Sequence, residues 1–343
     1  MKVLITGGAG FLGSRLAREL LQRGQLGGRT ITQLLLTDLA PQRDPGLSQD
    51  PRVRTHTGDL LASIATLMAE PRDAVFHLSS AVSAECESNF ELGLHANLDT
   101  TRKLLEACRA QTLAGGAVPL VFFSSSVAVF GNDPAIPLPA VVKDHTLPTP
   151  QSSYGVHKFV CEQLVADYTR KGFIDGRAAR LMTVSVRPGS PNGAASGFLS
   201  GMLREPLAGQ PSNCPVALDT MVALSSPANT VAGIVAVAEA SRDAFGGRTA
   251  INLPALTVSA GEMLDALREL AGEEVRALIS HDPDSAIGRI VAGWPARFEN
   301  RRAAGLGLRA DQDFATVLRQ YVQDNPAAIT HPAARARLGL KSS

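Results

Sequence analysis

The sequence has only four cysteines and almost no net charge, and both features narrow the possible functions. Cys86, Cys108, Cys161 and Cys214 form neither a metal-type doublet nor a paired spacing, which indicates reduced, mostly buried thiols. The 33 basic and 32 acidic residues leave a formal charge of +1, so no global field draws the protein toward nucleic acid or anionic lipid. We therefore expect small-molecule partners.

Long apolar runs and metal-ligand clusters are also missing. No apolar run approaches the roughly 20 residues that cross a bilayer. Residues 2–6 are apolar and lead at once into glycines, which leaves no room for the apolar core of a signal peptide. His, Cys and carboxylate residues never cluster at the spacing of zinc ligands. From these absences we expect a cytoplasmic protein with no membrane partner and no metal.

What the sequence does contain, up to about residue 190, is an alternation of short apolar runs with amphipathic stretches. This alternation predicts an α/β fold, a Rossmann-type doubly wound parallel sheet with helices on both faces. Leucines spaced four apart before Gly24 predict a first helix, and residues 97–109 predict another with Asn97 at its start. Strands are predicted at 2–6, 31–37, 73–78, 118–124 and 181–187.

The rhythm changes after Pro188. Residues 189–219 are rich in Gly, Pro, Ser and Asn, which is typical of a substrate-facing insertion. We expect residues 1–188 to form a dinucleotide-binding domain and residues 189–343 to form mainly a smaller substrate-binding lid, with part of 221–255 packing back on the first domain. The tail from Asn325 is basic and is expected to be solvated rather than an anion-binding arm. Later elements are predicted at 228–241, 249–253 and 259–271.

A glycine-rich loop follows the first predicted strand. Gly7, Gly10 and Gly13 occupy the positions of a dinucleotide-binding fingerprint. Gly7 permits the tight turn, Gly10 lets the backbone approach a pyrophosphate, and Gly13 lets the helix pack closely on the strand. The context of strand, loop and helix makes this pattern more specific than an isolated triplet. It predicts a bound dinucleotide.

Two carboxylates lie where predicted strands end. Asp38 ends the second strand, where its carboxylate accepts hydrogen bonds from an adenosine ribose and repels a 2′-phosphate, so we expect NAD rather than NADP. Asp59, followed by Leu60, comes after the third strand and either caps a helix or hydrogen-bonds the adenine. The sequence favours neither alternative for Asp59.

Tyr154 and Lys158 stand four residues apart, which places both on one face of a helix. A phenol with a pKa near 10 is a poor base at neutral pH, but an adjacent ammonium and a positive nicotinamide ring stabilise its phenolate. Upstream, the hydroxyls of residues 124–126 end an apolar strand, where one of them can position a substrate oxygen. The pattern therefore predicts that Tyr154 removes a proton from a hydroxyl while hydride leaves carbon.

Together these motifs resemble those of the extended short-chain dehydrogenase/reductase family, which contains nucleotide-sugar epimerases and dehydratases. The resemblance covers almost the whole chain and includes residues 6–13, 77–81, 123–131 and the Tyr154/Lys158 pair. It implies that Ser126 is the catalytic hydroxyl, that Lys158 also binds the nicotinamide ribose, and that a homodimer forms through helices near 97–113 and 152–172. The expected cofactor contacts are Gly7, Gly10, Phe11, Leu12, Asp38, Asp59, Leu60, Leu78, Ser79, Asn97, Ser124, Tyr154, Lys158 and Pro188.

The resemblance also separates the reactions found in this family. Dehydratases carry an acidic pair after the catalytic hydroxyl, but Val127 and Ala128 stand here, and neither can transfer a proton. Epimerases have an asparagine that holds the sugar-nucleotide diphosphate where this chain has Ser190. Residues 186–198, 204–207 and 167–177 are instead similar to a group of dehydrogenases that oxidise the C2 hydroxyl of a four-carbon sugar acid with NAD.

A small polyhydroxy acid needs short polar groups around it. The expected substrate contacts are Ser83, Ser126, Tyr154, Ser190, Asn192 and Ser196, although Asn192 is equally suited to a plain turn. Arg204 either binds a carboxylate or, as is commoner, pairs with Glu205. His157 is expected at the surface or at a subunit interface, and His77 is expected to be a hydrogen-bonded structural histidine.

The leading hypothesis is thus NAD-dependent oxidation of a small sugar acid. The first alternative is a nucleotide-sugar epimerase, in which NAD stays bound and is regenerated in each cycle. The second is a non-catalytic NAD-sensing protein on the same fold, which the retained Tyr154 and Lys158 disfavour.

Overall fold

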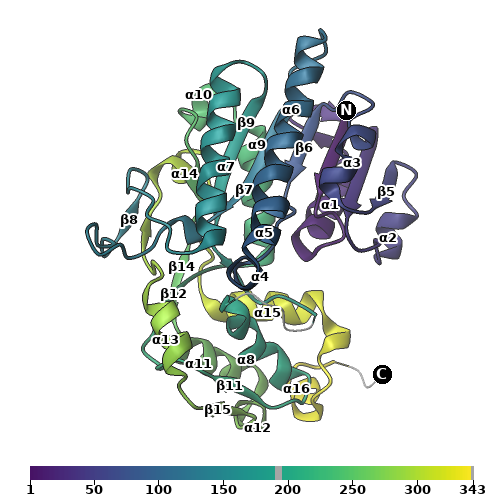
Figure 1. Ribbon diagram of the computed structural model, residues 1–343. Coiled ribbons are helices and arrows are strands. Elements are labelled where there is room, and N and C mark those ends of the chain that lie inside the picture. Colours follow the sequence, from purple (N-terminus) through teal and green to yellow (C-terminus); the bar gives the residue numbers. More distant parts are fainter. Residues whose placement is uncertain (190–194, 341–343) are drawn as a thin grey trace.

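A seven-stranded sheet forms the frame of the protein in the computed structural model, which describes residues 1–189 and 195–340 (Figure 1). Every neighbouring pair in this sheet is parallel. The order reverses between β1 and β6, and this switch point is where dinucleotides bind in doubly wound sheets. The predicted Rossmann-type fold is confirmed. In spatial order the strands are β13 (Ile251–Asn252), β9 (Asp175–Leu181), β7 (Leu120–Ser126), β6 (Ala74–His77), β1 (Lys2–Thr6), β4 (Gln33–Asp38) and β5 (Val53–Thr57).

Helices cover both faces of this sheet. One face packs on α3 (Leu60–Leu67), α6 (Thr100–Leu113) and α7 (Ser153–Arg170), and the other packs on α1 (Phe11–Arg23) and α9 (Pro227–Glu239). The central strands are therefore buried from both sides, which explains why they appear in the sequence as unbroken apolar runs. Helix α1 ends at Gly24 in the left-handed conformation, as its spacing predicts.

The predicted strand at 181–187 is wrong. The sheet strand is β9, which ends at Leu181, and the residues after it form the short β10 (Thr183–Val184) in a second sheet with β12 (Met221–Ser225) and β14 (Leu256–Ser259). Strand β9 contains two arginines, Arg177 and Arg180, and both are buried. Both arginines are buried in ion pairs. Since charged residues usually lie at the surface, their presence in the sequence does not suggest a buried strand.

The helix predicted at 97–109 is longer than expected. The chain is helical from α5 (Phe90–Gly93) through a π-helical turn at Leu94–Asp99 into α6, so Asn97 lies inside the turn and not at a helix start. A π-turn adds a residue to the helical repeat, and apolar periodicity therefore does not reveal it. The preceding α4 (Ser83–Ser88) faces the same end of the sheet as these turns.

The lower part of the molecule in Figure 1 has a hydrophobic core of its own. It runs from Val186 through helices α8, α11 and α15 to the end of the described chain. The tail after Asn325 is not solvated as expected, because Ile329 and Ala334 are fully buried in this core. The elements here are α8 (Phe198–Leu207), β11 (Ser212–Cys214), α11 (Ala260–Ala271), α12 (Glu273–Arg276), β15 (Ile279–His281), α13 (Ser285–Ala292), α15 (Phe314–Asp324) and α16 (Pro332–Arg337).

Smaller elements connect these layers. No helix in the described ranges is both long and apolar enough to span a bilayer. The connecting elements are β2 (Gln25–Leu26), β3 (Arg29–Thr30), α2 (Pro45–Ser48), β8 (Val142–Lys143), α10 (Arg242–Phe245), β16 (Phe298–Glu299), α14 (Arg301–Gly305) and the 3₁₀ turns Val127–Val129, Ala195–Gly197 and Pro326–Ala328.

Candidate active site

The glycine-rich loop lies between β1 and α1, at the switch point of the sheet. Gly7 has a φ of 71°, and a Cβ on it would lie 2.9 Å from the amide nitrogen of Ser79. A Cβ on Gly13 would lie 2.0 Å from the carbonyl oxygen of Gly7. Only glycine permits both the left-handed turn and this contact between helix and loop.

The first turn of α1 suits an anion. Gly10 is the N-cap residue and supplies no side-chain cap, so the leading N–H groups of the helix remain available to a ligand. The positive end of the helix dipole favours a pyrophosphate at this point. The amide of Gln42 supports the loop from behind by donating to the carbonyl of Gly8, at 2.9 Å.

Asp38 lies at the end of β4, directly beside this loop. Its Oδ2 accepts hydrogen bonds from the backbone N–H groups of Ala9 and Gly10, both at 3.1 Å. The carboxylate therefore lies next to the first turn of α1, where the ribose of a dinucleotide binds in this fold. It also holds the loop in shape, which the sequence pattern did not suggest.

Asp59 acts as a helix cap. Its Oδ1 accepts the backbone N–H of Ala62 at 2.8 Å and so caps α3, while its Oδ2 lies 3.4 Å from Nε2 of His95. The capping alternative is thus present in the fold. Contacts of Asp59 and the neighbouring Leu60 with an adenine remain predictions.

His77 organises the end of β6. Its Nδ1 lies 2.7 Å from the hydroxyl of Thr6 and its Nε2 lies 2.9 Å from that of Thr101. Burial, together with the charge of Lys158, lowers the pKa of His77 to about 3, so the ring is neutral. The prediction of a hydrogen-bonded structural histidine is confirmed. Thr6 in turn holds the backbone N–H of Leu78 and the hydroxyl of Ser79 at the crevice.

Asn97 supports the same loop from the π-turn. Its Oδ1 accepts from the hydroxyl of Ser80 at 2.9 Å and from the backbone N–H of Ala81 at 2.8 Å, and its side chain is buried. Its amide also contacts the Cys86 sulfur at 3.2 Å. With its polar atoms engaged in this way, Asn97 positions the loop after β6, and its expected contact with a cofactor stays a prediction.

Ser126, Tyr154 and Lys158 meet where β7 ends and α7 begins. Ser152 caps α7 by accepting the backbone N–H of Gly155 at 3.1 Å. A Cβ on Gly155 would lie 2.1 Å from the carbonyl oxygen of Ala128, so only glycine lets α7 approach the turn after Ser126 this closely. This contact brings the phenol of Tyr154 to the serine hydroxyl. The local sequence pattern does not reveal this role of Gly155.

Burial disfavours the charged forms of both Tyr154 and Lys158. It raises the pKa of Tyr154 to about 12, while a hydrogen bond with Ser126 and the positive charge of Arg187 act in the opposite direction. Burial also lowers the pKa of Lys158 to about 8. The ammonium of Lys158 donates to the carbonyl of Ser124 at 2.8 Å and lies 5.5 Å from the centre of the Tyr154 ring. Each further positive charge near the phenol lowers its pKa.

A buried ion pair lies behind the catalytic strand. Both carboxylate oxygens of Glu162 accept from Arg180, at 2.9 and 2.7 Å, and the Ser125 hydroxyl donates to the same carboxylate at 2.5 Å. Ser124 and Ser125 therefore face opposite sides of β7, as neighbouring strand residues do. Glu162 is one helical turn from Lys158, so the pair fixes α7 against β7 and β9. Nothing in the sequence beyond the two charges indicates this pair.

The structure describes only some of the residues that are expected to contact the substrate. Ser83 is half-buried at the start of α4, and Ser196 is half-buried in the 3₁₀ turn before α8. Ser190 and Asn192 lie outside the described residues. Pro188 is half-buried and follows Arg187 directly.

Two further expectations concern charged or titratable side chains. His157 is buried, so the expected surface position is wrong; its ring packs near Gly93 and Phe90. Arg204 pairs with Glu205 at 2.5 Å, the commoner of the two alternatives. Within the described residues no group of three His, Cys, Asp or Glu side chains is arranged to hold a metal ion.

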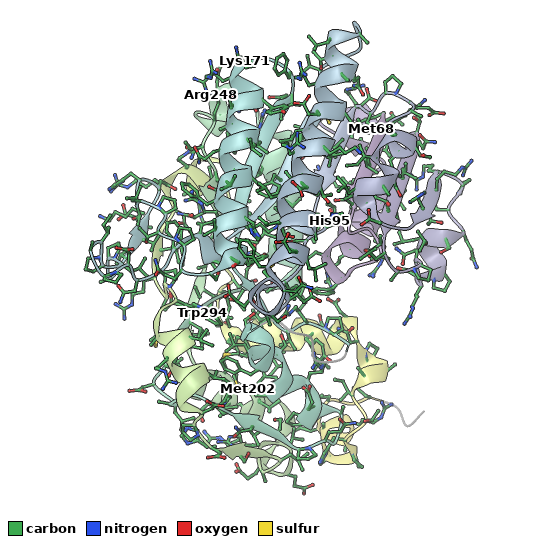
Figure 2. The ribbon with its side chains drawn as sticks, in the orientation of Figure 1. Met68, His95, Lys171, Met202, Arg248 and Trp294 are labelled. Carbon is green, nitrogen blue, oxygen red and sulfur yellow. The ribbon has the colours of Figure 1, made fainter. Side chains whose placement is uncertain are left out.

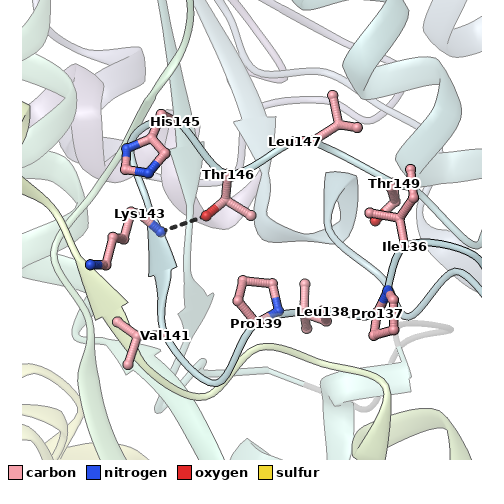
Figure 3. Close-up of a pocket in the computed structure, with 10 residues that line it drawn as sticks. All are labelled: Ile136, Pro137, Leu138, Pro139, Val141, Lys143, His145, Thr146, Leu147 and Thr149. Atoms are coloured by element: carbon pink, nitrogen blue, oxygen red, sulfur yellow. Dashed lines mark hydrogen bonds between the residues drawn. The ribbon is translucent and has the colours of Figure 1, made fainter.

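A pocket of about 390 Å³ lies in the segment around β8 (Figure 3). Its wall is largely apolar, with contributions from Ile136, Leu138 and Leu147, and the backbone N–H of Lys143 donates to the hydroxyl of Thr146 at 2.8 Å on one side. None of the expected site residues lines it. This pocket is therefore separate from the expected site.

Comparison with known proteins agrees with this geometry. Residues 3–244 match the model of the NAD dependent epimerase/dehydratase family. The chain belongs to this family. D-erythronate dehydrogenase from Cupriavidus necator is 47% identical over 94% of this chain and 98% of its own length, and the same-named protein from Haemophilus influenzae is 40% identical over 94% and 99%. The predicted resemblance to sugar-acid dehydrogenases is confirmed.

Solved structures of related proteins share the fold. The crystal structure of a nucleoside-diphosphate-sugar epimerase from Agrobacterium tumefaciens is 37% identical, covers 96% of this chain and 95% of its own, and has a TM-score of 0.89. The L-threonine dehydrogenase from Clostridium difficile has a TM-score of 0.80 at 22% identity, with 96% of this chain and 99% of its own covered. At that identity the second match shows the fold alone.

Proposed function

We propose that this protein oxidises the C2 hydroxyl of D-erythronate with NAD, giving 2-dehydro-D-erythronate. The identity of 47% to a D-erythronate dehydrogenase over 94% of the chain carries the proposal. The meeting of Ser126, Tyr154 and Lys158 at the end of β7, one strand from the switch point, supports it, because alcohol oxidation needs a base beside the hydroxyl and a hydride acceptor beside the carbon.

Each residue of the trio has a distinct task. The Ser126 hydroxyl hydrogen-bonds the substrate oxygen, and Tyr154 as phenolate accepts the C2 hydroxyl proton. Lys158 stabilises the phenolate through its positive charge and donates to the nicotinamide ribose. The C2 hydroxyl loses its proton to Tyr154, the C2 carbon loses a hydride, and the alcohol becomes a ketone. NAD, when bound, supplies the hydride-accepting ring.

The glycine-rich loop fits this cofactor. The uncapped N–H groups of α1 would hold the pyrophosphate, and Asp38 would hold the ribose hydroxyls and exclude a 2′-phosphate. The other cofactor contacts expected from the sequence belong to the same proposal, namely Leu78, Ser79, Asn97, Ser124 and Pro188. We also propose that the second hydrophobic core, built from Val186 and residues after 188, forms the substrate-binding domain, with β13 and α9 returning to the first.

The test is turnover with purified protein. D-erythronate and NAD should give NADH and a 2-keto acid in equal amounts, and NADP should be a much poorer acceptor. The absence of NADH with D-erythronate and other four-carbon sugar acids would refute the proposal.

An epimerase of nucleotide sugars is the second candidate, favoured by the name of the Agrobacterium tumefaciens relative. Such an enzyme regenerates its NAD within each cycle, so it yields no net NADH. Epimerisation of a nucleotide sugar together with no net NADH from sugar acids would favour this candidate.

A homodimer belongs to the same proposal. Val156 and Val160 are 43% and 37% exposed one turn apart on α7, and Phe90 on the neighbouring α5 is 58% exposed. An apolar strip of this kind on adjacent helices suits a second copy of the chain. Sedimentation of the native protein against the Val160→Glu variant tests this, with a shift toward monomer expected for the variant. The cytoplasmic location stays a prediction.

A further inference from the structure

Arg187 lies immediately after the last residues that cross from the sheet into the lower core. Two hydrogen bonds from α8 fix its backbone: its N–H donates to the Ser200 hydroxyl at 3.0 Å, and its carbonyl accepts from Arg204 at 3.0 Å. The next residue is Pro188, whose ring restricts the chain further. The base of the Arg187 side chain is therefore held firmly.

The guanidinium of Arg187 makes no hydrogen bond or ion pair with any residue in 1–189 or 195–340, although the side chain is half-buried. Burial and the nearby positive charge of Arg204 lower its pKa, so its charge is costly in this place. A half-buried guanidinium with five donors and no acceptor is stabilised by an anion that binds beside it.

Other arginines near the site are already paired. Arg204 binds Glu205 and the Arg187 carbonyl, and Arg180 is held by both oxygens of Glu162. The ammonium of Lys158 faces the carbonyl of Ser124 and the Tyr154 ring. Within the described residues, Arg187 is thus the cation beside the catalytic residues whose N–H donors have no acceptor.

Arg187 lies at the same end of the sheet as Ser126. Strand β9 ends at Leu181, which pairs with Ser126 of β7, and Arg187 follows six residues later. In agreement with this placement, the positive charge of Arg187 lowers the pKa of Tyr154. In a 2-hydroxy acid the carboxylate is bonded directly to the carbon that loses hydride. A cation that binds this carboxylate must therefore lie next to the base that takes the hydroxyl proton.

We propose that Arg187 binds the carboxylate of the 2-hydroxy acid and is the residue that selects acids over neutral polyols. This inference rests on the proposed function, since it concerns the same reacting carbon. Both carboxylate oxygens accept from the planar guanidinium, which orients C2 toward Tyr154. Arg204 and Ser200 are positioning residues, because they hold the backbone of Arg187.

The test compares D-erythronate with its neutral amide in the wild type, Arg187→Met and Arg187→Lys. In Arg187→Met, the ratio of kcat/KM for the acid over that for the amide should fall about 10- to 100-fold, which is the value of one charge-assisted hydrogen-bonded pair. In Arg187→Lys, the logarithm of this ratio should fall about half as far. KM for the acid should carry most of the change. Arg248→Met is the matched control, because Arg248 is exposed at the far end of the sheet domain from the lid (Figure 2).

Two readouts separate folding from recognition. Both Arg187 variants should bind NAD as the wild type does, and Arg187→Met should show a pH profile moved to higher pH, because the positive charge that lowers the Tyr154 pKa is gone. Should Arg187→Met fail to fold, the acid-over-amide ratio of Arg187→Lys decides. Equal losses for acid and amide, or an unchanged ratio, overturn the Arg187 assignment alone. A wild type inactive on sugar acids overturns the proposed function.

Discussion

The cofactor side and the substrate side of the crevice are built in different ways. On the cofactor side, the loop after β1 and Asp38 at the end of β4 lie at adjacent strand ends, so the pairing of the two strands brings Asp38 to the backbone of Ala9 and Gly10. On the substrate side, Arg187 and Arg204 take their roles from contacts with α8 and with each other. Strand-end geometry thus builds the proposed cofactor side, whereas contacts with α8 build the proposed substrate side.

The largest expected effect is on kcat, from the loss of the Tyr154 hydroxyl, which lies between the proposed cofactor and substrate sides. Tyr154→Phe should lower kcat by about 10³-fold or more, since the variant lacks the group that accepts the proton. NAD affinity should stay near that of the wild type, measured by fluorescence titration. Near-normal turnover would remove Tyr154 from the mechanism.

The ion pair behind the strands should matter for stability. Arg180→Met leaves the Glu162 carboxylate buried and unpaired, which costs about 3–5 kcal/mol of unfolding free energy. Arg170→Met, which breaks the exposed pair with Asp167, should cost less than about 1 kcal/mol. Urea denaturation of both variants checks the contrast. Equal losses would mean that the Glu162 pair does not fix α7 against the sheet.

Lys158 predicts a pH effect on stability in the protein without cofactor. The folded-state pKa is lowered to about 8, below the value of about 10.4 for an unfolded lysine. Between these values the unfolded chain binds more protons, so the free energy of unfolding rises with pH relative to Lys158→Met. Denaturation at a series of alkaline pH values measures this difference. A difference that is flat with pH would contradict the shift.

The smallest expected effect concerns cofactor choice. Asp38→Asn keeps an acceptor for the loop amides but removes the negative charge, so the preference for NAD over NADP should fall about 10-fold. Asp44→Asn is the control, because Asp44 caps α2 close by. An unchanged preference would assign the discrimination to another group.

The same contrast explains how much the sequence predicts. The glycine spacing, the strand end at Asp38 and the four-residue step from Tyr154 to Lys158 are local, so the fold and the candidate trio follow from the residues alone. These positions can be recognised without the distant chain, whereas the hydrogen bonds that join Asp38 to Ala9 and Gly10 cannot.

The failures all depend on distant partners. Strand β9 was misplaced because Arg177 and Arg180 look exposed until their carboxylate partners are known. The buried tail and the buried His157 likewise depend on helices remote in sequence. The π-turn at Asn97 breaks the helical period that sequence reasoning uses. Arg187 was not singled out because nothing in its neighbourhood marks it as unpaired.

Transfer of the C2 hydrogen tests the account most directly. D-erythronate carrying deuterium at C2 is incubated with the wild type and NAD, and the mass of the cofactor product is measured. The account predicts NADH that carries the deuterium, formed in equal amount with an unlabelled 2-keto acid. Label that stays on the sugar, or cofactor that returns to NAD without label, would contradict it.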